Sequence, residues 1–151
     1  MHERVMEEGG ASAEGLIVAV EQMVRYVRRS ARTGGLSPAA SSALGRLGRD
    51  GPYRLTDLAR AERVSQPNMT QLVTRMERAG LVRRVADASD GRGVLVEITD
   101  TGLTVFGQRR AERARALEEL VEEMAGPEQE AVRIALPALA RAIENRHSDH
   151  P

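Results

Sequence analysis

Residues 65–99 have the sequence SQPNMTQLVTRMERAGLVRRVADASDGRGVLVEIT, in which the spacing of apolar residues changes from helical to strand-like at Gly80. Ser65 is a favourable N-cap, Pro67 suits a first turn, and Gly80 suits the position after a helix end. Between them, apolar side chains recur at helical spacing at Met69, Leu72, Val73 and Met76. Beyond Gly80 the period is two along residues 81–85 and 94–98, around a polar turn at 87–91. The stretch therefore predicts a helix followed by a β-hairpin.

A shorter helix is predicted immediately before this one. Thr56 is expected to cap a helix over Asp57–Ala61, after a short extended segment at residues 53–55, and Arg63-Val64 forms a tight connection to Ser65. Helix, turn, second helix and two-stranded ribbon is the order of a winged helix-turn-helix, whose second helix enters the DNA major groove. We expect a mostly α-helical fold with a small β-wing.

Helical patterns flank this core on both sides. A helix is predicted from residue 13 to Gly34-Gly35, and Ser37-Pro38 opens another that ends near Leu47. After the hairpin, Thr99 and Asp100 cap a long helix to Gly126, and a last helix follows, which Pro137 is expected to kink or break. The predicted division is a flexible arm (1–12), an N-terminal helix (13–35), the winged helix-turn-helix (36–99), C-terminal helices (100–146) and a loose tail (147–151).

Composition restricts the classes of function. The 151 residues fit one domain, and the absence of cysteine excludes disulfides, thiolate metal sites and thiol-oxidation sensing. The three histidines, His2, His147 and His150, lie in the terminal segments, so we expect no catalytic site, no metal and no cofactor. The apolar run Leu16 to Val20 is too short for a signal peptide or a membrane span, and a cytoplasmic protein that is not an enzyme is expected.

The polar face of the second helix carries the functional signal. With 22 basic and 22 acidic residues the net charge is zero, so affinity for DNA must come from a local surface. Glu77 is the one acidic residue of this helix; the side chains left on its outer face are Asn68, Thr70, Gln71, Thr74, Arg75 and Arg78. Asn and Gln can pair with adenine and Arg with guanine. This face predicts DNA contact; the alternatives are an ordinary solvated face or a winged-helix module that binds proteins and not DNA.

Longer motifs in the same region resemble the MarR family of transcriptional regulators. They are Ser65-x-Pro67-x-x-Thr70-x-x-Val73, Arg78-Ala79-Gly80-Leu81-Val82-x-Arg84, Asp87-x-x-Asp90-x-Arg92 and Gly93-Val94-Leu95-Val96-Glu97-Ile98-Thr99-x-x-Gly102. The resemblance implies that Ser65, Gln66 and Pro67 begin the recognition helix, that Arg92 enters the minor groove, and that Asp90 holds the wing tip through a salt bridge. Gly91 departs from the family, which usually has a basic residue there. Phosphate contacts are predicted for Arg54, Arg83 and Arg84.

The resemblance also implies how the flanking helices are used. In the family they interleave between two subunits, and a two-fold dimer would read a palindromic site with half-sites about 34–36 Å apart; a monomeric helical cap is the alternative. Many members respond to a small molecule held in a cleft, which the resemblance places near Arg25, Tyr26, Arg28 and Arg46. We therefore expect a homodimeric, sequence-specific regulator of double-stranded DNA that a small-molecule effector releases. Repression is the working hypothesis. The sequence does not distinguish repressors from activators, because both use the same DNA contacts.

Overall fold

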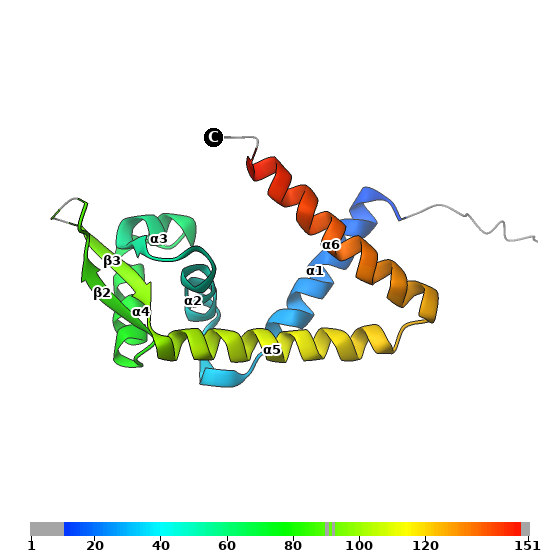
Figure 1. Ribbon diagram of the computed structural model, residues 1–151, viewed down its shortest axis with the longest axis horizontal. Coiled ribbons are helices and arrows are strands. Elements are labelled where there is room, and N and C mark those ends of the chain that lie inside the picture. Colours follow the sequence, from blue (N-terminus) through cyan, green and yellow to red (C-terminus); the bar gives the residue numbers. More distant parts are fainter. Residues whose placement is uncertain (1–10, 90, 92, 149–151) are drawn as a thin grey trace, which may run out of the picture.

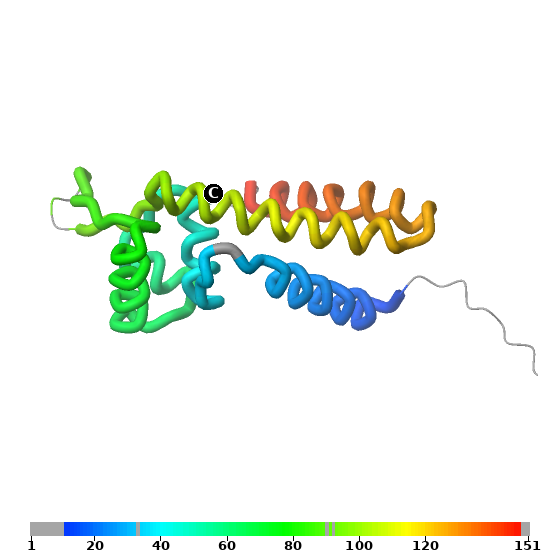
Figure 2. The backbone as a smooth tube through the Cα atoms, turned by 90° about the horizontal axis from the view of Figure 1, so that it is seen from below, coloured from blue at the N-terminus to red at the C-terminus, as the bar shows by residue number. Residues whose placement is uncertain are grey.

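The computed structural model describes residues 11–89, 91 and 93–148, and consists of helices around a small sheet (Figure 1). The elements in chain order are α1 (Ala13–Ser30), the 3-10 turn η1 (Thr33–Gly35), α2 (Pro38–Asp50), β1 (Tyr53–Arg54), α3 (Leu55–Ala61), α4 (Gln66–Arg78), β2 (Val82–Ala86), β3 (Val94–Ile98), α5 (Asp100–Glu122) and α6 (Gly126–Ser148). Helices α2, α3 and α4 and the sheet gather at one end of α5, whereas α6 starts from its other end. Figure 2 shows α1 diverging from α5 towards its own N-terminal end. The predicted mostly helical fold with a small β-wing is confirmed.

The hydrophobic core lies within the winged helix-turn-helix. The apolar face predicted for α4 is buried, and it packs with α2, α3 and the sheet. The largest fully buried side chains come from all of these elements: Leu44, Leu47, Leu58, Met69, Val73, Val82 and Val96. This core therefore fixes which side of α4 faces outwards.

The sheet has three antiparallel strands in the order β1-β3-β2, one more than the predicted ribbon. Strand β2 pairs with β3 from Val82 opposite Ile98 to Ala86 opposite Val94, and β1 adds the pair Tyr53 opposite Val96. The segment containing β1 was expected to be extended, but two residues show no period from which a pairing partner can be inferred.

Several helix boundaries differ from the predictions. Helix α1 ends at Ser30, before the predicted stop at Gly34-Gly35, and α5 ends at Glu122, before Gly126. Helix α3 begins at Leu55 with Arg54 as its N-cap, so the prediction that Thr56 caps it was wrong. The helix begins earlier than predicted, and the side chain of its first residue, Leu55, packs against the core. Helix α2 continues past Gly48 to Asp50 and ends at Gly51, whose φ of 89° suits glycine. Gly48 is a packing position, because a Cβ there would lie 2.8 Å from a ring carbon of Phe106.

Helix α6 continues through Pro137 to Ser148, two residues beyond the predicted end at Arg146. Pro137 therefore does not break it. The proline leaves the carbonyl of Arg133 without its helical hydrogen bond, but both residues are exposed, so water can satisfy that carbonyl. Residues 1–10 and 149–151, which include most of the predicted arm and tail, lie outside the described residues.

Helices α1 and α6 bury none of their residues within the chain. The exposed fractions are 58% for Leu16, 64% for Ile134 and 58% for Ile143, so these helices present large apolar side chains to the surface. An ion pair between Arg133 and Glu118 ties α6 to α5. None of the described helices combines the length and apolar character that crossing a membrane requires.

A close contact joins the start of α5 to the wing. Thr99 caps α5 by accepting a hydrogen bond from the Gly102 amide at 3.0 Å, and its hydroxyl donates to the Gly80 carbonyl at 2.5 Å. Gly102 is buried, and a Cβ at this position would lie 2.1 Å from the Leu81 carbonyl oxygen. Only glycine allows this approach, so Gly102 sets how α5 meets α4 and β2.

Gly102→Ala is expected to lower the free energy of unfolding by about 1–3 kcal/mol or more, since the new methyl group has no room. Gly107→Ala is the matched control on the same helix, because a Cβ at Gly107 meets nothing within 4 Å. The control should stabilise the protein by about 0.5–1 kcal/mol through helix propensity. Thermal or urea unfolding at one protein concentration compares the two, and equal effects would contradict the packing argument.

Candidate nucleic-acid interface

Helix α4 presents a polar surface that its ends and its buried face fix in place. The Ser65 hydroxyl caps it by accepting from the Asn68 amide at 3.3 Å. At the other end the amides of Gly80 and Leu81 bond the carbonyls of Glu77 and Met76, and Gly80 has a φ of 75°. The exposed side chains predicted to contact DNA are Ser65, Gln66, Pro67, Asn68, Thr70, Gln71, Arg75 and Arg78, whereas Thr74 is half-buried.

The arginines and threonines of this surface differ in what their polar atoms already bind. Within the described part of the chain, the side chains of Arg75 and Arg78 form no ion pair or hydrogen bond, so their guanidinium groups are available. Thr70 donates its hydroxyl to the Gln66 carbonyl at 2.9 Å. Thr74 donates to the Thr70 carbonyl at 2.8 Å and accepts from Arg84 at 3.0 Å. The Thr74 hydroxyl is therefore occupied within the protein.

All three arginines predicted to contact phosphates take part in ion pairs. Arg54 bonds Asp87 at 2.9 Å, Arg83 pairs with Glu97 on the neighbouring strand, and Arg84 bonds Glu77 at 2.7 Å. These pairs connect β1, β2, β3 and α4. The phosphate contacts stay predictions, and what the geometry adds is a role for each arginine in holding the wing.

Asp87 organises the base of the wing, a role that was not predicted from the sequence. Its buried carboxylate accepts from the Ser89 amide at 3.0 Å, the Ser89 hydroxyl at 2.7 Å and Arg54 Nε at 2.9 Å. These bonds, chiefly those from Ser89, hold the pKa of Asp87 below its usual value. The Asp87-x-Ser89 spacing, typical of a turn in which an aspartate bonds the backbone two residues on, was the available signal. Asp90 and Arg92 lie outside the described residues.

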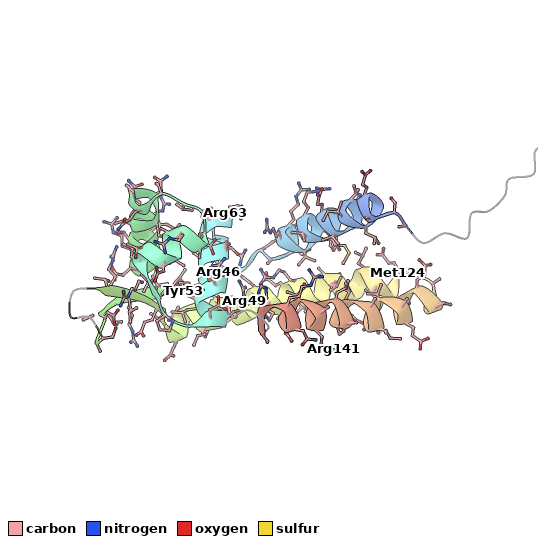
Figure 3. The ribbon with its side chains drawn as sticks, turned by 90° about the horizontal axis from the view of Figure 1, so that it is seen from above. Arg46, Arg49, Tyr53, Arg63, Met124 and Arg141 are labelled. Carbon is pink, nitrogen blue, oxygen red and sulfur yellow. The ribbon has the colours of Figure 1, made fainter. Side chains whose placement is uncertain are left out.

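The residues predicted to bind an effector do not lie together. Arg25 and Tyr26 line a cavity of about 790 Å³ between α1 and α5, with Met23, Arg29, Arg32 and Leu120 among its other walls. Arg28 is exposed and does not line it. Arg46 lies in the winged-helix part of the molecule (Figure 3), where its Nε donates to Glu62 at 2.6 Å. This hydrogen bond raises the pKa of Arg46. Arg46 therefore joins α2 to α3.

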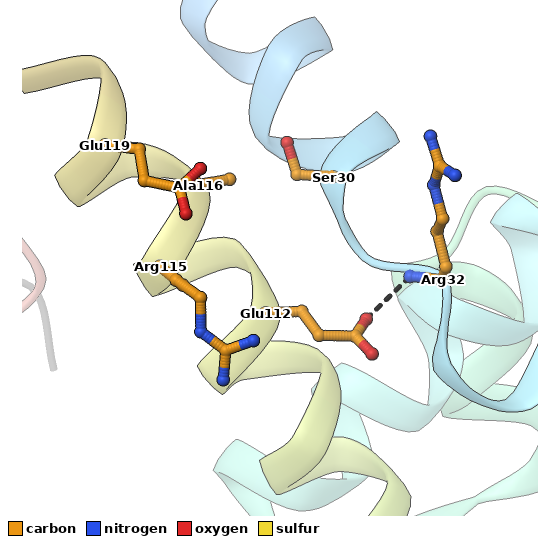
Figure 4. A pocket seen from close by; sticks show the side chains of 6 residues that line it. All are labelled: Ser30, Arg32, Glu112, Arg115, Ala116 and Glu119. Carbon is orange, nitrogen blue, oxygen red and sulfur yellow. Dashed lines mark hydrogen bonds between the residues drawn. The ribbon is translucent and has the colours of Figure 1, made fainter. Parts of the chain in front are cut away.

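A smaller cavity of about 290 Å³ adjoins the larger one, with which it shares Ser30 and Arg32 (Figure 4). The Arg32 amide donates to the Glu112 carboxylate at 2.6 Å, which ties the end of α1 to α5. The other side chains around it are Arg115, Ala116 and Glu119. Both cavities thus border the segment that links α1 to the winged helix.

Basic side chains also gather where α2 meets α5. Burial lowers the pKa of Arg113, and the charges of Arg109, Arg110 and Arg49 lower it further. Arg110 lies over the Phe106 ring, 4.8 Å from its centre. Four arginine side chains therefore lie near one another at this junction. Among residues 11–89, 91 and 93–148, no group of three or more His, Asp or Glu side chains is arranged to hold a metal ion.

Comparisons with known proteins show similarity to one family of transcriptional regulators. A family model described as MarR family matches residues 36–94, from before α2 to the first residue of β3. The uncharacterized HTH-type transcriptional regulator ML2140 of Mycobacterium leprae (strain TN) is 32% identical over 120 residues, which cover 80% of this chain and 82% of that protein. YfiV of Bacillus subtilis (strain 168), also named an uncharacterized HTH-type transcriptional regulator, is 30% identical over 66% of this chain and 62% of its own length.

Solved structures share the fold. The transcriptional regulator Tm0710 from Thermotoga maritima has a TM-score of 0.74 at 24% identity, covering 88% of this chain and 94% of that one. A mutant of Staphylococcus aureus MepR bound to an oligodeoxyribonucleotide has a TM-score of 0.62 at 20% identity, with 89% and 99% covered. NadR in complex with 4-hydroxyphenylacetate has a TM-score of 0.60 at 22% identity, with 91% and 98% covered. ML2140, YfiV and Tm0710 are named as transcriptional regulators, which is consistent with the expectation that the chain is not an enzyme.

The pKa of Asp87 is expected to lie below that of an ordinary aspartate, because the hydrogen bonds from Ser89 and Arg54 stabilise its carboxylate. Because its pKa is lowered in the folded state, its contribution to the stability of the wing is present above the unfolded pKa and is lost as the pH falls through the folded pKa. Carboxyl-detected NMR titration measures the midpoint. Ser89→Ala should raise this midpoint more than Arg54→Ala, because Ser89 supplies the larger effect; the reverse order would show that the Arg54 ion pair dominates.

Proposed function

Because this chain belongs to the MarR family and is a DNA-binding transcriptional regulator, we propose that it represses transcription as a homodimer bound to a palindromic operator, and that a small anionic molecule releases it. The observation that carries the proposal is the surface of α4. Its apolar side chains are all buried, and its outward side chains are amides, hydroxyls and arginines beside a three-stranded wing.

The proposed DNA complex places α4 in the major groove. Asn68, Gln71 and Arg75 would reach base edges, for which amide and guanidinium groups are suited. The N-terminal end of α4, at Ser65 to Pro67, and the exposed Arg78 would contact phosphates. Arg92 would enter the minor groove, where a narrow groove concentrates negative potential. MepR, solved with an oligodeoxyribonucleotide, supports DNA as the ligand of this fold.

The proposed dimer uses the apolar surfaces of α1 and α6. No residue of these helices is fully buried within the chain, and Leu16, Ile134 and Ile143 are each more than half exposed. A second copy related by a two-fold axis would cover them and would place two α4 helices one DNA turn apart. In this arrangement residues 36–99 bind DNA, while residues 13–35 and 100–146 form the dimer.

The proposed effector site is the cavity between α1 and α5. Three of its side chains, Arg25, Arg29 and Arg32, are cationic, while Met23, Tyr26 and Leu120 supply apolar surface. This combination suits a small aromatic carboxylate, and NadR, solved with 4-hydroxyphenylacetate, supports that class of ligand. The ligand must bind more tightly to the dimer spacing that does not fit the operator, since only differential affinity shifts a population.

Fluorescence anisotropy with the DNA upstream of the gene tests the proposal. The protein should bind this duplex more tightly than a scrambled one and saturate at two chains per site. Arg75→Ala should cost about 1–3 kcal/mol at particular base pairs. Equally weak binding to both duplexes, with helical content intact, would favour the protein-interaction alternative.

The same assay tests the effector. 4-Hydroxyphenylacetate should weaken binding to the upstream DNA, and Arg25→Ala should reduce that response without changing binding in its absence. An unchanged response in Arg25→Ala would place the ligand elsewhere.

Ile134→Asp should convert the dimer to a monomer, because a carboxylate cannot be buried unpaired in an apolar interface. Val94→Asp is the control, since Val94 is also exposed, at 43%, but lies on the wing. Sedimentation velocity measures the mass of each variant. If Ile134→Asp remains dimeric, α6 does not form the dimer contact.

A further inference from the structure

Glu77 is the one acidic residue on the helix proposed to enter the major groove. It directly precedes the exposed Arg78 and lies three residues after Thr74, and its carboxylate contacts β2. A free carboxylate at this place would repel the phosphates that Arg75 and Arg78 attract. A DNA-binding surface that carries it needs a way to neutralise it.

Arg84 on β2 binds this carboxylate through both of its oxygens. Its Nη1 donates to Glu77 Oε1 at 2.7 Å, and its backbone amide donates to Glu77 Oε2 at 3.2 Å. Its Nη2 donates to the Thr74 hydroxyl at 3.0 Å. The side chains are 29% exposed for Arg84 and 38% for Glu77, so the pair is partly shielded from solvent. One arginine thus links the wing strand to two successive turns of α4.

We propose that Arg84 is a positioning residue that masks the Glu77 carboxylate from DNA and sets the orientation of the wing strand on the recognition helix. The inference rests on the proposed DNA contact of α4. This role is proposed in place of a direct phosphate contact by Arg84, because two guanidinium nitrogens of Arg84 already bind Glu77 and Thr74. The side chains of Arg75 and Arg78, in contrast, are exposed and bind no partner among the described residues.

The proposal predicts that the effect of removing Arg84 depends on the charge of residue 77. Without the Arg84 side chain, Glu77 keeps only the backbone donor and becomes an uncompensated negative charge beside the DNA. Glu77→Gln then removes the charge with little change in shape. Loss of Arg84 should therefore be harmful when residue 77 is Glu and nearly harmless when it is Gln.

The experiment compares the wild type, Arg84→Ala, Glu77→Gln and the double variant by operator affinity at several salt concentrations, with thermal unfolding alongside. Arg84→Ala should weaken binding about tenfold or more. The double variant should return to within about twofold of Glu77→Gln, with the salt slope of the wild type. Arg84→Lys, which keeps the charge, should retain most of the affinity.

A matched pair on the wing controls for the general gain in DNA affinity when any carboxylate is lost. Glu97 pairs with Arg83 but lies on β3, not on the recognition helix. Glu97→Gln should therefore not compensate for Arg83→Ala.

Two results would overturn the inference. If the double variant binds as weakly as Arg84→Ala, with a salt slope reduced by about one charge, Arg84 contacts a phosphate directly. If binding follows the loss of thermal stability without recovery in the double variant, Arg84 only supports the fold. A wild type that does not distinguish the upstream DNA from scrambled DNA would instead refute the proposed function.

Discussion

Burial of the apolar face of α4 is the constraint on which the rest of the structure depends. Met69, Leu72, Val73 and Met76 pack against α2, α3 and the sheet, and together they leave no rotational freedom to the helix. The side chains of α4 that are proposed to contact DNA point outwards because these four point inwards. The Ser65 cap and the positive φ of Gly80 fix the two ends, so the length of the polar surface is also determined.

Ion pairs carry this arrangement from the helix to the wing. The chain has no net charge, yet few of the arginines around α4 and the wing are available to a polyanion, because Arg54, Arg83 and Arg84 are bonded to carboxylates. Arginine suits this task since its planar group can bond several oxygens in fixed directions. In the proposed DNA complex, affinity would therefore depend on Arg75 and Arg78, whose side chains have no partner among the described residues.

Helix α5 connects DNA binding to the proposed dimer and effector site. Its first turn is held on the wing by Thr99 and by the close approach at Gly102, and its middle holds the Arg32 amide through Glu112. A rearrangement of α1 against α5 would therefore reach the winged helix through one continuous element. Because no residue of α1 or α6 is fully buried within the chain, the proposed partner subunit would supply much of the apolar burial that holds these helices.

Local pattern in the sequence determined α4, its cap, its polar face and the hairpin, because each depends on residues within a few positions of one another. Tertiary structure alone decided the pairing of β1 with β3, the course of α2 past Gly48 under Phe106, and the start of α3 at Leu55. It also decided that Arg84 binds Glu77, and that Arg46 joins α2 to α3 and does not line the cavity with Tyr26. The physical reason is distance along the chain: these contacts join residues from different elements, and no local periodicity records which side chains the packed core brings together.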